Sequence, residues 1–406
     1  MKILISTIGS RGDVQPLLAL AQQLLALGQA PCVCAPPNFR EWVESYGVGF
    51  VPIGPDVKQL ARNNPSSKPP RPTKARRAQL AEYTVREQFR VLGEAARGSG
   101  LLIGGGALQI ALPSIAEALG IPYVYVAYCP ATLPSPDHPP AKMDVHYPSW
   151  LPAPINRLLW RRDARGWNRL FGTALNDQRA KVGLPPVPHV RRYVFGDRPW
   201  LAADPALAPT ADSPGMHIVQ TGSWILRDET PLSPAIDRFL QSGDAPVYFG
   251  FGSMREEKHT GAMLIEGARR IGRRSVILRG WADLGSSPLG DDCLVIEDVD
   301  HDTLFPRMAA IVHHGGAGTT DAAARSGRPQ VAVPHHYDQF YWAGRVKTLG
   351  IGAADFTRRE LTADKLAKSL ESCLRRATAE RASSFAKRMT EDGARTAAQR
   401  LIDGGP

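Results

Sequence analysis

The side chains best suited to chemistry form one short stretch, His313-His314-Gly315-Gly316-Ala317-Gly318-Thr319-Thr320. An apolar run over 309–312 precedes it and predicts a buried strand, and small residues over 319–325 predict a helix. A strand that turns through glycines into a helix leaves unpaired N–H groups at the positive end of the helix dipole, and both suit a phosphate. The spacing matches neither G-x-G-x-x-G nor the P-loop, and a tight turn with two surface histidines is the alternative.

The elements that must position this stretch alternate along the chain. In the first half we expect strands over 2–7, 31–35, 48–52, 101–103, 122–126 and 200–203, and helices over 16–27, 79–97, 110–119 and 155–183. In the second half we expect strands over 246–251, 275–278, 294–296, 309–312 and 330–333, and helices over 259–272, 319–325, 340–349, 361–376 and 380–402. Such βαβ repeats predict an α/β protein with two doubly wound parallel sheets.

The domain boundaries follow from composition. A stretch rich in proline, alanine, serine and glycine over 205–222 predicts a linker. We therefore expect an N-terminal domain over 1–205, a linker over 206–225 and a C-terminal domain over 226–380. A C-terminal helix over 381–406 could cross back to the first domain.

Ligands of open parallel sheets bind beyond the carboxyl ends of the strands. In the second half those ends carry Ser253, Trp281, Val299, the stretch 314–319 and the pair Asp338-Gln339. In the first half the corresponding end carries residues 10–13. If the two edges face each other across a cleft, Asp13 lies opposite the predicted phosphate-binding turn.

One long connection, 128–154, shows no periodicity and is rich in proline and aromatic residues, including Tyr128, His146 and Trp150. A long loop inside a compact domain is usually functional or disordered. Its apolar, aromatic character favours the wall of a pocket for a second substrate. The alternative is an ordered crossover with packed prolines.

The composition excludes several classes of protein. The chain has 406 residues, a formal charge of +10 and five cysteines without a C-x-x-C pair, which suits a reducing cytoplasm. It shows no signal peptide and no apolar run of about 18 residues, so we expect no membrane span. Basic clusters at 58–77 and 157–169 predict a solvated loop and a helix face, and nothing indicates a nucleic-acid module. Weak attraction to an anionic membrane surface or an anionic donor stays open.

Taken together, these segments resemble the family-1, GT-B-fold glycosyltransferases over essentially the whole chain. The likeness is greatest to the bacterial natural-product branch, including glycopeptide-antibiotic glycosyltransferases, and the chain is also similar to sterol glucosyltransferases. The motifs that carry it are Gly9-Ser10-Arg11-Gly12-Asp13-Val14-Gln15-Pro16, Gln220-Thr221-Gly222, Gly250-Phe251-Gly252-Ser253, Arg279-Gly280-Trp281, the 313–320 stretch and Asp338-Gln339.

The resemblance implies inverting transfer of a sugar, glucose by preference, from a UDP- or dTDP-sugar to a hydroxyl of a small hydrophobic or aromatic acceptor. Plant members carry a histidine base where this chain has Asp13, which would take the acceptor proton as in the antibiotic and sterol branches. A helix N-cap is the alternative role for Asp13. The N-terminal domain would bind the acceptor, with Tyr128, His146 and Trp150 in the loop.

The same resemblance assigns the donor site to the C-terminal domain. The diphosphate would meet His314, Gly316, Gly318, Thr319 and Ser253, and the sugar hydroxyls would meet Asp338 and Gln339. The backbone of Val299 would contact the base, Trp281 could stack on it, and Ser10 and Arg11 are weaker candidates near the cleft. Because a helix dipole would stabilise the leaving group, we expect no metal and no cofactor besides the donor.

Three alternatives stay open. Asp298-Val299-Asp300 spells the D-x-D pattern that holds a divalent cation in GT-A enzymes. Nucleotide-sugar 2-epimerases share the GT-B fold, although the loop over 128–154 argues against them. A catalytically idle nucleotide-sugar-binding partner protein would not need Asp13 or the Asp338-Gln339 pair. The acceptor, including a sterol or lipid, and the oligomeric state are not indicated by the sequence.

Overall fold

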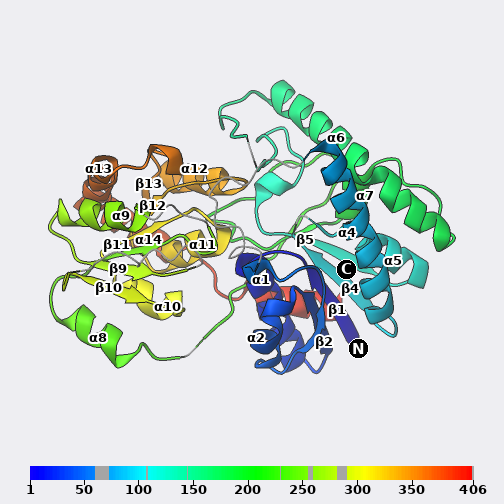
Figure 1. The fold of residues 1–406 in the computed structure, drawn as a ribbon, viewed down its shortest axis with the longest axis horizontal. Coiled ribbons are helices and arrows are strands. Elements are labelled where there is room, and N and C mark those ends of the chain that lie inside the picture. Colours follow the sequence, from blue (N-terminus) through cyan, green and yellow to red (C-terminus); the bar gives the residue numbers. More distant parts are fainter. Residues whose placement is uncertain are drawn as a thin grey trace.

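The computed structural model describes residues 1–59, 73–106, 108–143, 145–228, 230–254, 259–280 and 290–404. Two parallel sheets form the two halves of the molecule, the first from the N-terminal part of the chain and the second from the C-terminal part (Figure 1). This arrangement confirms the predicted pair of α/β halves. Within the described ranges, no helix combines the length and apolar composition needed to cross a membrane.

The first sheet has the strand order β3-β2-β1-β4-β5-β6-β7. Its strands are β1 Lys2–Thr7, β2 Ala30–Ala35, β3 Gly49–Pro52, β4 Leu101–Gly105, β5 Tyr123–Ala127, β6 Trp200–Leu201 and β7 Val219–Gln220. The helices of this half are α1 Arg11–Ala26, α2 Arg40–Glu44, α4 Lys74–Ala95, α5 Leu112–Leu119, α6 Ala153–Lys181 and α7 Val190–Phe195.

Alternate side chains of β1 enter cores on opposite faces of this sheet. Ile3 and Ile5 pack into the core that contains α1, whereas Leu4 packs into the core that contains α4 and α5. Because both faces are covered, the central strands are apolar throughout rather than alternating, as expected for a parallel sheet.

The second sheet has the order β10-β9-β8-β11-β12-β13. Its strands are β8 Val247–Gly250, β9 Ser275–Leu278, β10 Cys293–Ile296, β11 Ala310–His313, β12 Gln330–Ala332 and β13 Gly352–Ala353. Its helices are α8 Pro234–Gln241, α9 Thr260–Arg269, α10 His301–Leu304, α11 Ala317–Arg325, α12 Gln339–Leu349, α13 Ala363–Cys373 and α14 Arg376–Ala386.

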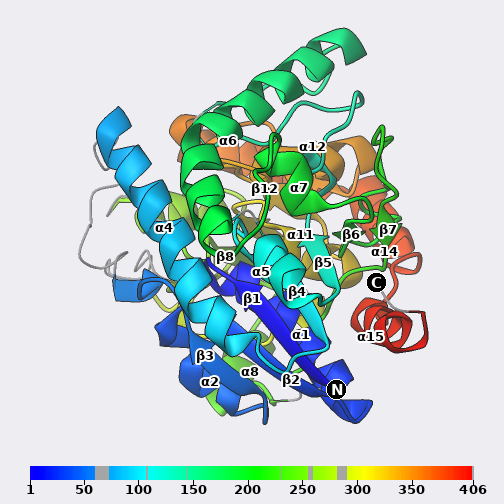
Figure 2. The same cartoon turned by 90° about the vertical axis from the view of Figure 1, so that its right-hand side faces the viewer.

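The chain returns to the first half at its end. The last helix, α15 Gly393–Asp403, places Ala394, Ala397 and Leu401 in the core of the first half (Figure 2). The expectation of one helix over 380–402 is wrong, because α14 ends at Ala386 and α15 begins at Gly393. The intervening bend lets the chain cross between the halves before it packs.

The two chain segments that connect the halves meet at glycines. Gly222 has φ +85°, and a Cβ there would lie 3.2 Å from the Cα of Gly393. A Cβ on Gly393 would lie 2.4 Å from the carbonyl oxygen of Ser223. Any side chain at Gly393 would therefore push the two crossings apart.

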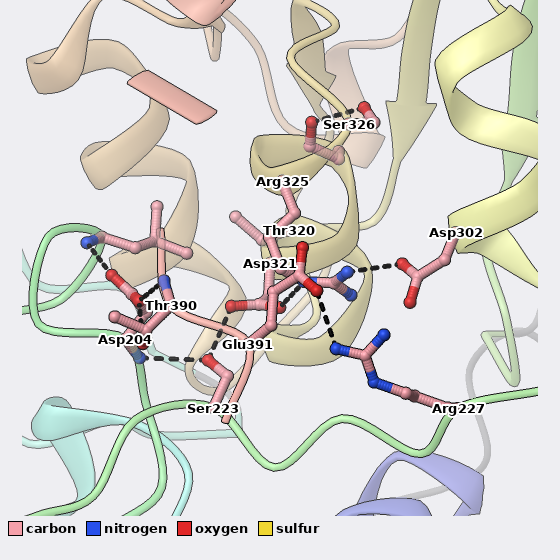
Figure 3. Close-up of polar contacts among 12 residues, drawn as sticks. Asp204, Ser223, Arg227, Asp302, Thr320, Asp321, Arg325, Ser326, Thr390 and Glu391 are labelled. Carbon is pink, nitrogen blue, oxygen red and sulfur yellow. Dashed lines mark hydrogen bonds and ion pairs between the residues drawn. The ribbon is translucent and has the colours of Figure 1, made fainter. Parts of the chain in front are cut away.

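A polar network whose members Asp204, Ser223 and Asp321 are buried joins these crossings to α11 (Figure 3). Asp204 accepts hydrogen bonds from the N–H and hydroxyl of Thr390, both at 2.8 Å, and its own N–H donates to Ser223 Oγ at 3.0 Å. Ser223 Oγ donates to Asp321 at 2.6 Å, and Arg325 Nε donates to the same carboxylate at 2.8 Å. The network therefore ties both crossings to the helix that follows the predicted phosphate turn.

Two expectations about boundaries differ from the structure. The first helix begins at Arg11, so Pro16 lies inside it rather than at its first position. Strand β7 lies within the predicted linker 206–225 and pairs with β6, so 200–203 is not the last strand of the first sheet. A two-residue strand carries no periodicity, which is why the sequence did not indicate it.

Candidate active site

The carboxyl ends of the two sheets approach each other across the molecule. Arg11, at the start of α1, forms an ion pair with Asp298, which follows β10. The N–H of Tyr337, after β12, donates to the carbonyl of Lys142 at 3.0 Å. The structure thus brings the N-terminal motif over 9–16 and the C-terminal motifs to one place.

Asp13 lies in the first turn of α1 with its carboxylate folded back on the helix N-terminus. Ser10 is the N-cap residue, and Asp13 is the third helical residue of a capping box. Asp13 Oδ2 accepts from the Ser10 N–H at 2.8 Å and from Ser10 Oγ at 3.2 Å. The N-cap alternative for Asp13 is therefore wrong, since Ser10 has that position.

The other carboxylate oxygen of Asp13 faces a glycine. A Cβ on Gly106, which has φ +82°, would lie 3.3 Å from Asp13 Oδ1, and a Cβ on Gly9 would lie 2.2 Å from Oδ2. Two glycines thus make room for this carboxylate. Burial raises the pKa of Asp13, while the hydrogen bonds from the Ser10 backbone and side chain oppose that rise.

The turn after β11 leaves its helix N-terminus open. Gly316 is the N-cap residue of α11 and brings no side chain, and Gly315 has φ +82°. His313 Nδ1 accepts from the Gly315 N–H at 3.0 Å, so His313 Nε2 donates to Gln330 Oε1 at 2.8 Å. His313 is fully buried and braces the turn, whereas the first N–H groups of α11 have no partner within the helix.

His314 lies across the mouth of this turn. Its Nε2 lies 2.4 Å from where a Gly316 Cβ would be, and its Cε1 lies 3.3 Å from where a Gly252 Cβ would be. Burial, with smaller contributions from His313 and neighbouring histidines, holds the pKa of His314 well below its usual value. At neutral pH His314 is therefore an uncharged imidazole beside the N-terminus of α11.

The remaining phosphate candidates surround the same turn. Gly318 is exposed with open space around it, and Thr319 is half-buried in the first turn of α11. Ser253 is half-buried and follows Gly252, which has φ +56°. Trp281 lies outside the described residues.

The bend after β12 carries the predicted sugar-binding pair. Asp338 Oδ2 accepts from Trp342 Nε1 at 3.1 Å, and burial, together with the charge of Asp13, raises the pKa of Asp338 to about 6. Gln339 is buried, and its Oε1 accepts from the N–H groups of His335 and His336 at 2.8 and 3.1 Å. Among the described residues, Asp338 Oδ1 therefore has no side-chain hydrogen-bond donor, whereas the amide oxygen of Gln339 already accepts two hydrogen bonds within the bend.

Both carboxylates of the D-x-D pattern have protein partners. Asp298 pairs with Arg11, whose guanidinium lies 4.9 Å from the ring centre of Trp42. Asp300 caps α10 by accepting from the Thr303 N–H at 2.8 Å. Val299, between them, is partly buried against the core of the second half. One carboxylate therefore joins the two halves and the other caps a helix, and this arrangement does not favour a shared cation.

The predicted acceptor residues separate in the structure. The ring of His146 stacks on Phe340 with centres 4.1 Å apart. Tyr128 donates from its hydroxyl to the Asp13 carbonyl at 3.0 Å, so it anchors α1. Trp150 is 77% exposed and has no ring contact within the described part of the chain, which argues against its place in a pocket wall.

Sequence reasoning missed a buried ion cluster behind the loop. Asp163 is almost fully buried and pairs with both Arg191 and Lys142. The Arg191 guanidinium also donates to the Thr132 carbonyl at 3.0 Å. Three ring centres lie 5.0 to 5.2 Å from it, those of Trp160, Trp167 and Phe195. The available signal was the spacing of Asn156, Trp160 and Asp163, which share the buried face of an arginine-rich helix.

Comparisons with known proteins agree with this geometry. Residues 3–135 match the family model for the glycosyltransferase family 28 N-terminal domain, and residues 282–402 match the erythromycin biosynthesis protein CIII-like C-terminal domain. The chain is 40% identical over 405 residues to a vancomycin aglycone glucosyltransferase of Amycolatopsis orientalis, covering 99% of this chain and 97% of that protein.

Two further proteins extend the comparison. A dTDP-epi-vancosaminyltransferase of Amycolatopsis orientalis is 41% identical over 362 residues, covering 87% of this chain and 85% of that protein. The solved glycosyltransferase of kitacinnamycin has a TM-score of 0.74 at 18% identity, covering 98% of each chain, which supports the fold alone. The two facing parallel sheets thus have the GT-B architecture. The chain belongs to the glycosyltransferases of the glycopeptide-antibiotic type, so the predicted enzyme class is confirmed.

Proposed function

We propose that this chain is an inverting O-glycosyltransferase that moves a hexose, glucose first, from a UDP- or dTDP-sugar to a hydroxyl of a hydrophobic, aromatic natural product. The observation that carries the proposal is that two half-buried carboxylates, one from each half, lie near each other where the halves meet. Asp13 and Asp338 are close enough for the charge of one to raise the pKa of the other. A base and a sugar-binding carboxylate would need this proximity.

Asp13 is suited to take the proton of the acceptor. Ser10 holds Oδ2, and Oδ1 faces the space beside Gly106. An unperturbed aspartate is a weak base at neutral pH, so the raised pKa of Asp13 improves its match to a hydroxyl proton. As Asp13 removes the proton, the acceptor oxygen bonds to the anomeric carbon and the bond to the diphosphate breaks on the opposite face, which inverts the configuration.

In the proposed reaction, the negative charge that develops on the leaving diphosphate would lie at the N-terminus of α11. Unpaired N–H groups and the positive end of the helix dipole stabilise an anion there. His314 can add a neutral donor, and Thr319 and Ser253 can add hydroxyls. Since these groups suffice in this scheme and Asp298 and Asp300 have other partners, the reaction proposed here uses no metal ion.

The relatives narrow the substrates to be tested. One named relative transfers glucose to vancomycin aglycone and another is named for a dTDP-sugar, at nearly equal identity. The free oxygen of Asp338 favours a donor sugar with hydroxyls to bind, which supports glucose. A phenolic peptide such as vancomycin aglycone is the first acceptor to test, with macrolides and sterols as the alternatives.

The test is product formation followed by mass spectrometry. The protein is mixed with UDP-glucose and, separately, with dTDP-glucose, against vancomycin aglycone, simple phenols, macrolides and sterols, with and without EDTA. We expect a mass gain of one hexose on a phenolic acceptor, unaffected by EDTA. Transfer only to sterols would replace the acceptor class, and strict metal dependence would overturn the metal-free scheme. Tight nucleotide binding without transfer to any acceptor would favour the idle-partner alternative.

A further inference from the structure

The bend that carries Asp338 is attached to the loop of the other half. Besides the hydrogen bond from the Tyr337 N–H to the Lys142 carbonyl at 3.0 Å, the ring of Phe340 stacks on His146. Tyr341 meets His138 edge-on with ring centres 6.3 Å apart. Three contacts in a row therefore join residues 337–341 to the loop over 128–154.

Tyr337 has an unusual backbone. Its φ is +58°, and it is the one non-glycine residue with positive φ in the described ranges. A bulky side chain in this region is strained unless its surroundings hold it there. A strained backbone at Tyr337, next to Asp338, indicates that the tyrosine side chain itself is needed there, since a glycine would adopt this φ without strain.

The phenol of Tyr337 reaches into the first half. Its pKa is raised by burial and by the nearby Tyr125, Asp338 and Cys129, while Arg191 opposes the rise. Three of these groups, Tyr125, Cys129 and Arg191, belong to the first half. The side chain of Tyr337 therefore lies near buried residues of the first half.

The loop is held from behind by the ion cluster. Lys142, whose carbonyl accepts from Tyr337, pairs through its ammonium group with Asp163. Asp163 is almost fully buried and pairs in turn with Arg191. A continuous path thus runs from the sugar-binding bend through Lys142 to a rigid, buried part of the first half.

We propose that Tyr337 is a positioning residue that docks the Asp338 bend onto the 128–154 loop, so that sugar binding and acceptor-loop position depend on each other. The inference rests on the proposed function, in which Asp338 holds the donor sugar and the loop borders the acceptor. In this arrangement the bend reaches its sugar-binding geometry only while the loop is docked. The turn before α11 packs against the backbone of Gln339, where a Gly315 Cβ would lie 3.0 Å from the Gln339 carbonyl oxygen. A change confined to the Tyr337 side chain leaves that backbone contact in place, so we expect the phosphate site to keep its affinity.

The first test compares nucleotide with nucleotide sugar. Tyr337→Gly removes the side chain, keeps the N–H and permits φ +58° without strain. We expect the affinity for UDP to stay as in the wild type, and the affinity for UDP-glucose relative to UDP to fall about tenfold, a typical coupling between sites. Tyr337→Asn is the second variant, since asparagine also tolerates this backbone region. Tyr337→Phe keeps the ring and should retain most of the ratio.

The second test measures how well the 128–154 loop is protected from proteolysis and does not require turnover. Trypsin cleaves after Lys142, and the next residue, Met143, is 59% exposed. Loss of docking should speed cleavage at this bond about tenfold in Tyr337→Gly, because protection there depends on local opening. Peptide mapping by mass spectrometry identifies the site, and UDP-glucose should slow the cut in the wild type more than UDP does.

Arg345→Ala is the matched control. Arg345 also lies on α12 and also crosses to the first half, where its Nε donates to the Leu207 carbonyl at 2.8 Å. Its loss should leave both the UDP-glucose to UDP ratio and the cut after Lys142 unchanged. Either readout unchanged in Tyr337→Gly, or equal changes in Arg345→Ala, would overturn the inference. If the wild type binds UDP-glucose no better than UDP while cleavage still changes in Tyr337→Gly, the proposed donor is contradicted rather than the docking.

Discussion

Two strand-to-helix turns at the carboxyl edges of the sheets, one after β1 and one after β11, differ in what occupies the N-terminus of the helix that follows. In the first turn, Asp13 folds back and accepts from Ser10, so a carboxylate already satisfies the start of α1. In the second, Gly316 caps α11 without a side chain, and the start of that helix stays open to an anion. The turn after β1 thus holds a carboxylate at its helix N-terminus, whereas the turn after β11 leaves that position available to an anion.

The difference shows that the residues at the start of the helix decide whether its N-terminus holds a carboxylate of the chain or stays open to an anion. A carboxylate at the N-terminus of a helix is stabilised by the same N–H groups that would otherwise hold a phosphate. In the proposed function, the anion-binding site and the proton acceptor therefore lie on separate sheets. The predictions that follow remove or exchange the features that distinguish the two turns.

The largest effect is expected from removing the charge of the first turn. Asp13→Asn keeps the shape and the contact with Ser10 but cannot accept a proton, so turnover should fall by about 10²- to 10⁴-fold. Affinity for UDP, measured by calorimetry, should stay close to that of the wild type. Asp13→Glu serves as the control that restores a carboxylate. Full activity of Asp13→Asn would remove the base assignment.

The next effect comes from giving the second turn the chemistry of the first. Gly316→Asp places a carboxylate at the start of α11, where it displaces His314 and repels a diphosphate. A charge pair about 4 Å apart in a partly screened site interacts by several kcal/mol, so UDP affinity should fall about a hundredfold or more.

The matched control lies two residues further along the chain. Gly318→Ala adds a methyl group into open space, because a Cβ at Gly318 meets nothing within 4 Å. We expect UDP affinity near the wild-type value and slightly higher thermal stability, since alanine favours a helix. Equal losses in Gly316→Asp and Gly318→Ala would show that the turn senses bulk rather than charge.

The positions of these turns could be predicted from the sequence, but the hydrogen bonds within them could not. Strand and helix alternation gave both sheets, and the glycines around His314 marked the open helix start. Pro16 misled the helix boundary, since a proline inside a helix is uncommon and the first-position role is the usual one. Because the sequence predicts a helix that begins at residue 16 rather than at Arg11, it does not reveal Ser10 as the N-cap residue.

Contacts between distant segments were the least predictable. Asp163 and Arg191 lie in different helices, and their pairing depends on the way α6 and α7 fold over the loop. Likewise the positive φ of Tyr337 has no sequence signal, because tyrosine rarely adopts it. The resemblance of motifs predicted a sugar-binding role for Gln339 but did not reveal that its amide oxygen accepts hydrogen bonds within the bend.

A smaller effect is expected at His314. His314→Ala removes a neutral donor beside Gly316, and a hydrogen bond to a charged group contributes about 1.5–3 kcal/mol, so UDP affinity should fall roughly tenfold. Because the pKa of His314 lies well below its usual value, the wild-type affinity should not change through this residue between about pH 7 and 8. His314→Gln keeps a donor and should lose less. Unchanged UDP affinity in His314→Ala would count against the phosphate site.

The smallest effect is expected from removing the Ser10 hydroxyl, which hydrogen-bonds Asp13 in the first turn. Ser10→Ala removes a cap, which costs about 1 kcal/mol of folding stability, and leaves the backbone N–H of residue 10 to hold Asp13. The Ser10 hydroxyl favours the charged carboxylate, so its loss should raise the pKa of Asp13 further. Since the base acts only when deprotonated, the acid limb of kcat/KM should shift to higher pH. Ser10→Thr, which retains a hydroxyl, should not shift the limb. An acid limb that is unchanged or lower in Ser10→Ala would mean that the Ser10 hydroxyl does not stabilise the ionised Asp13.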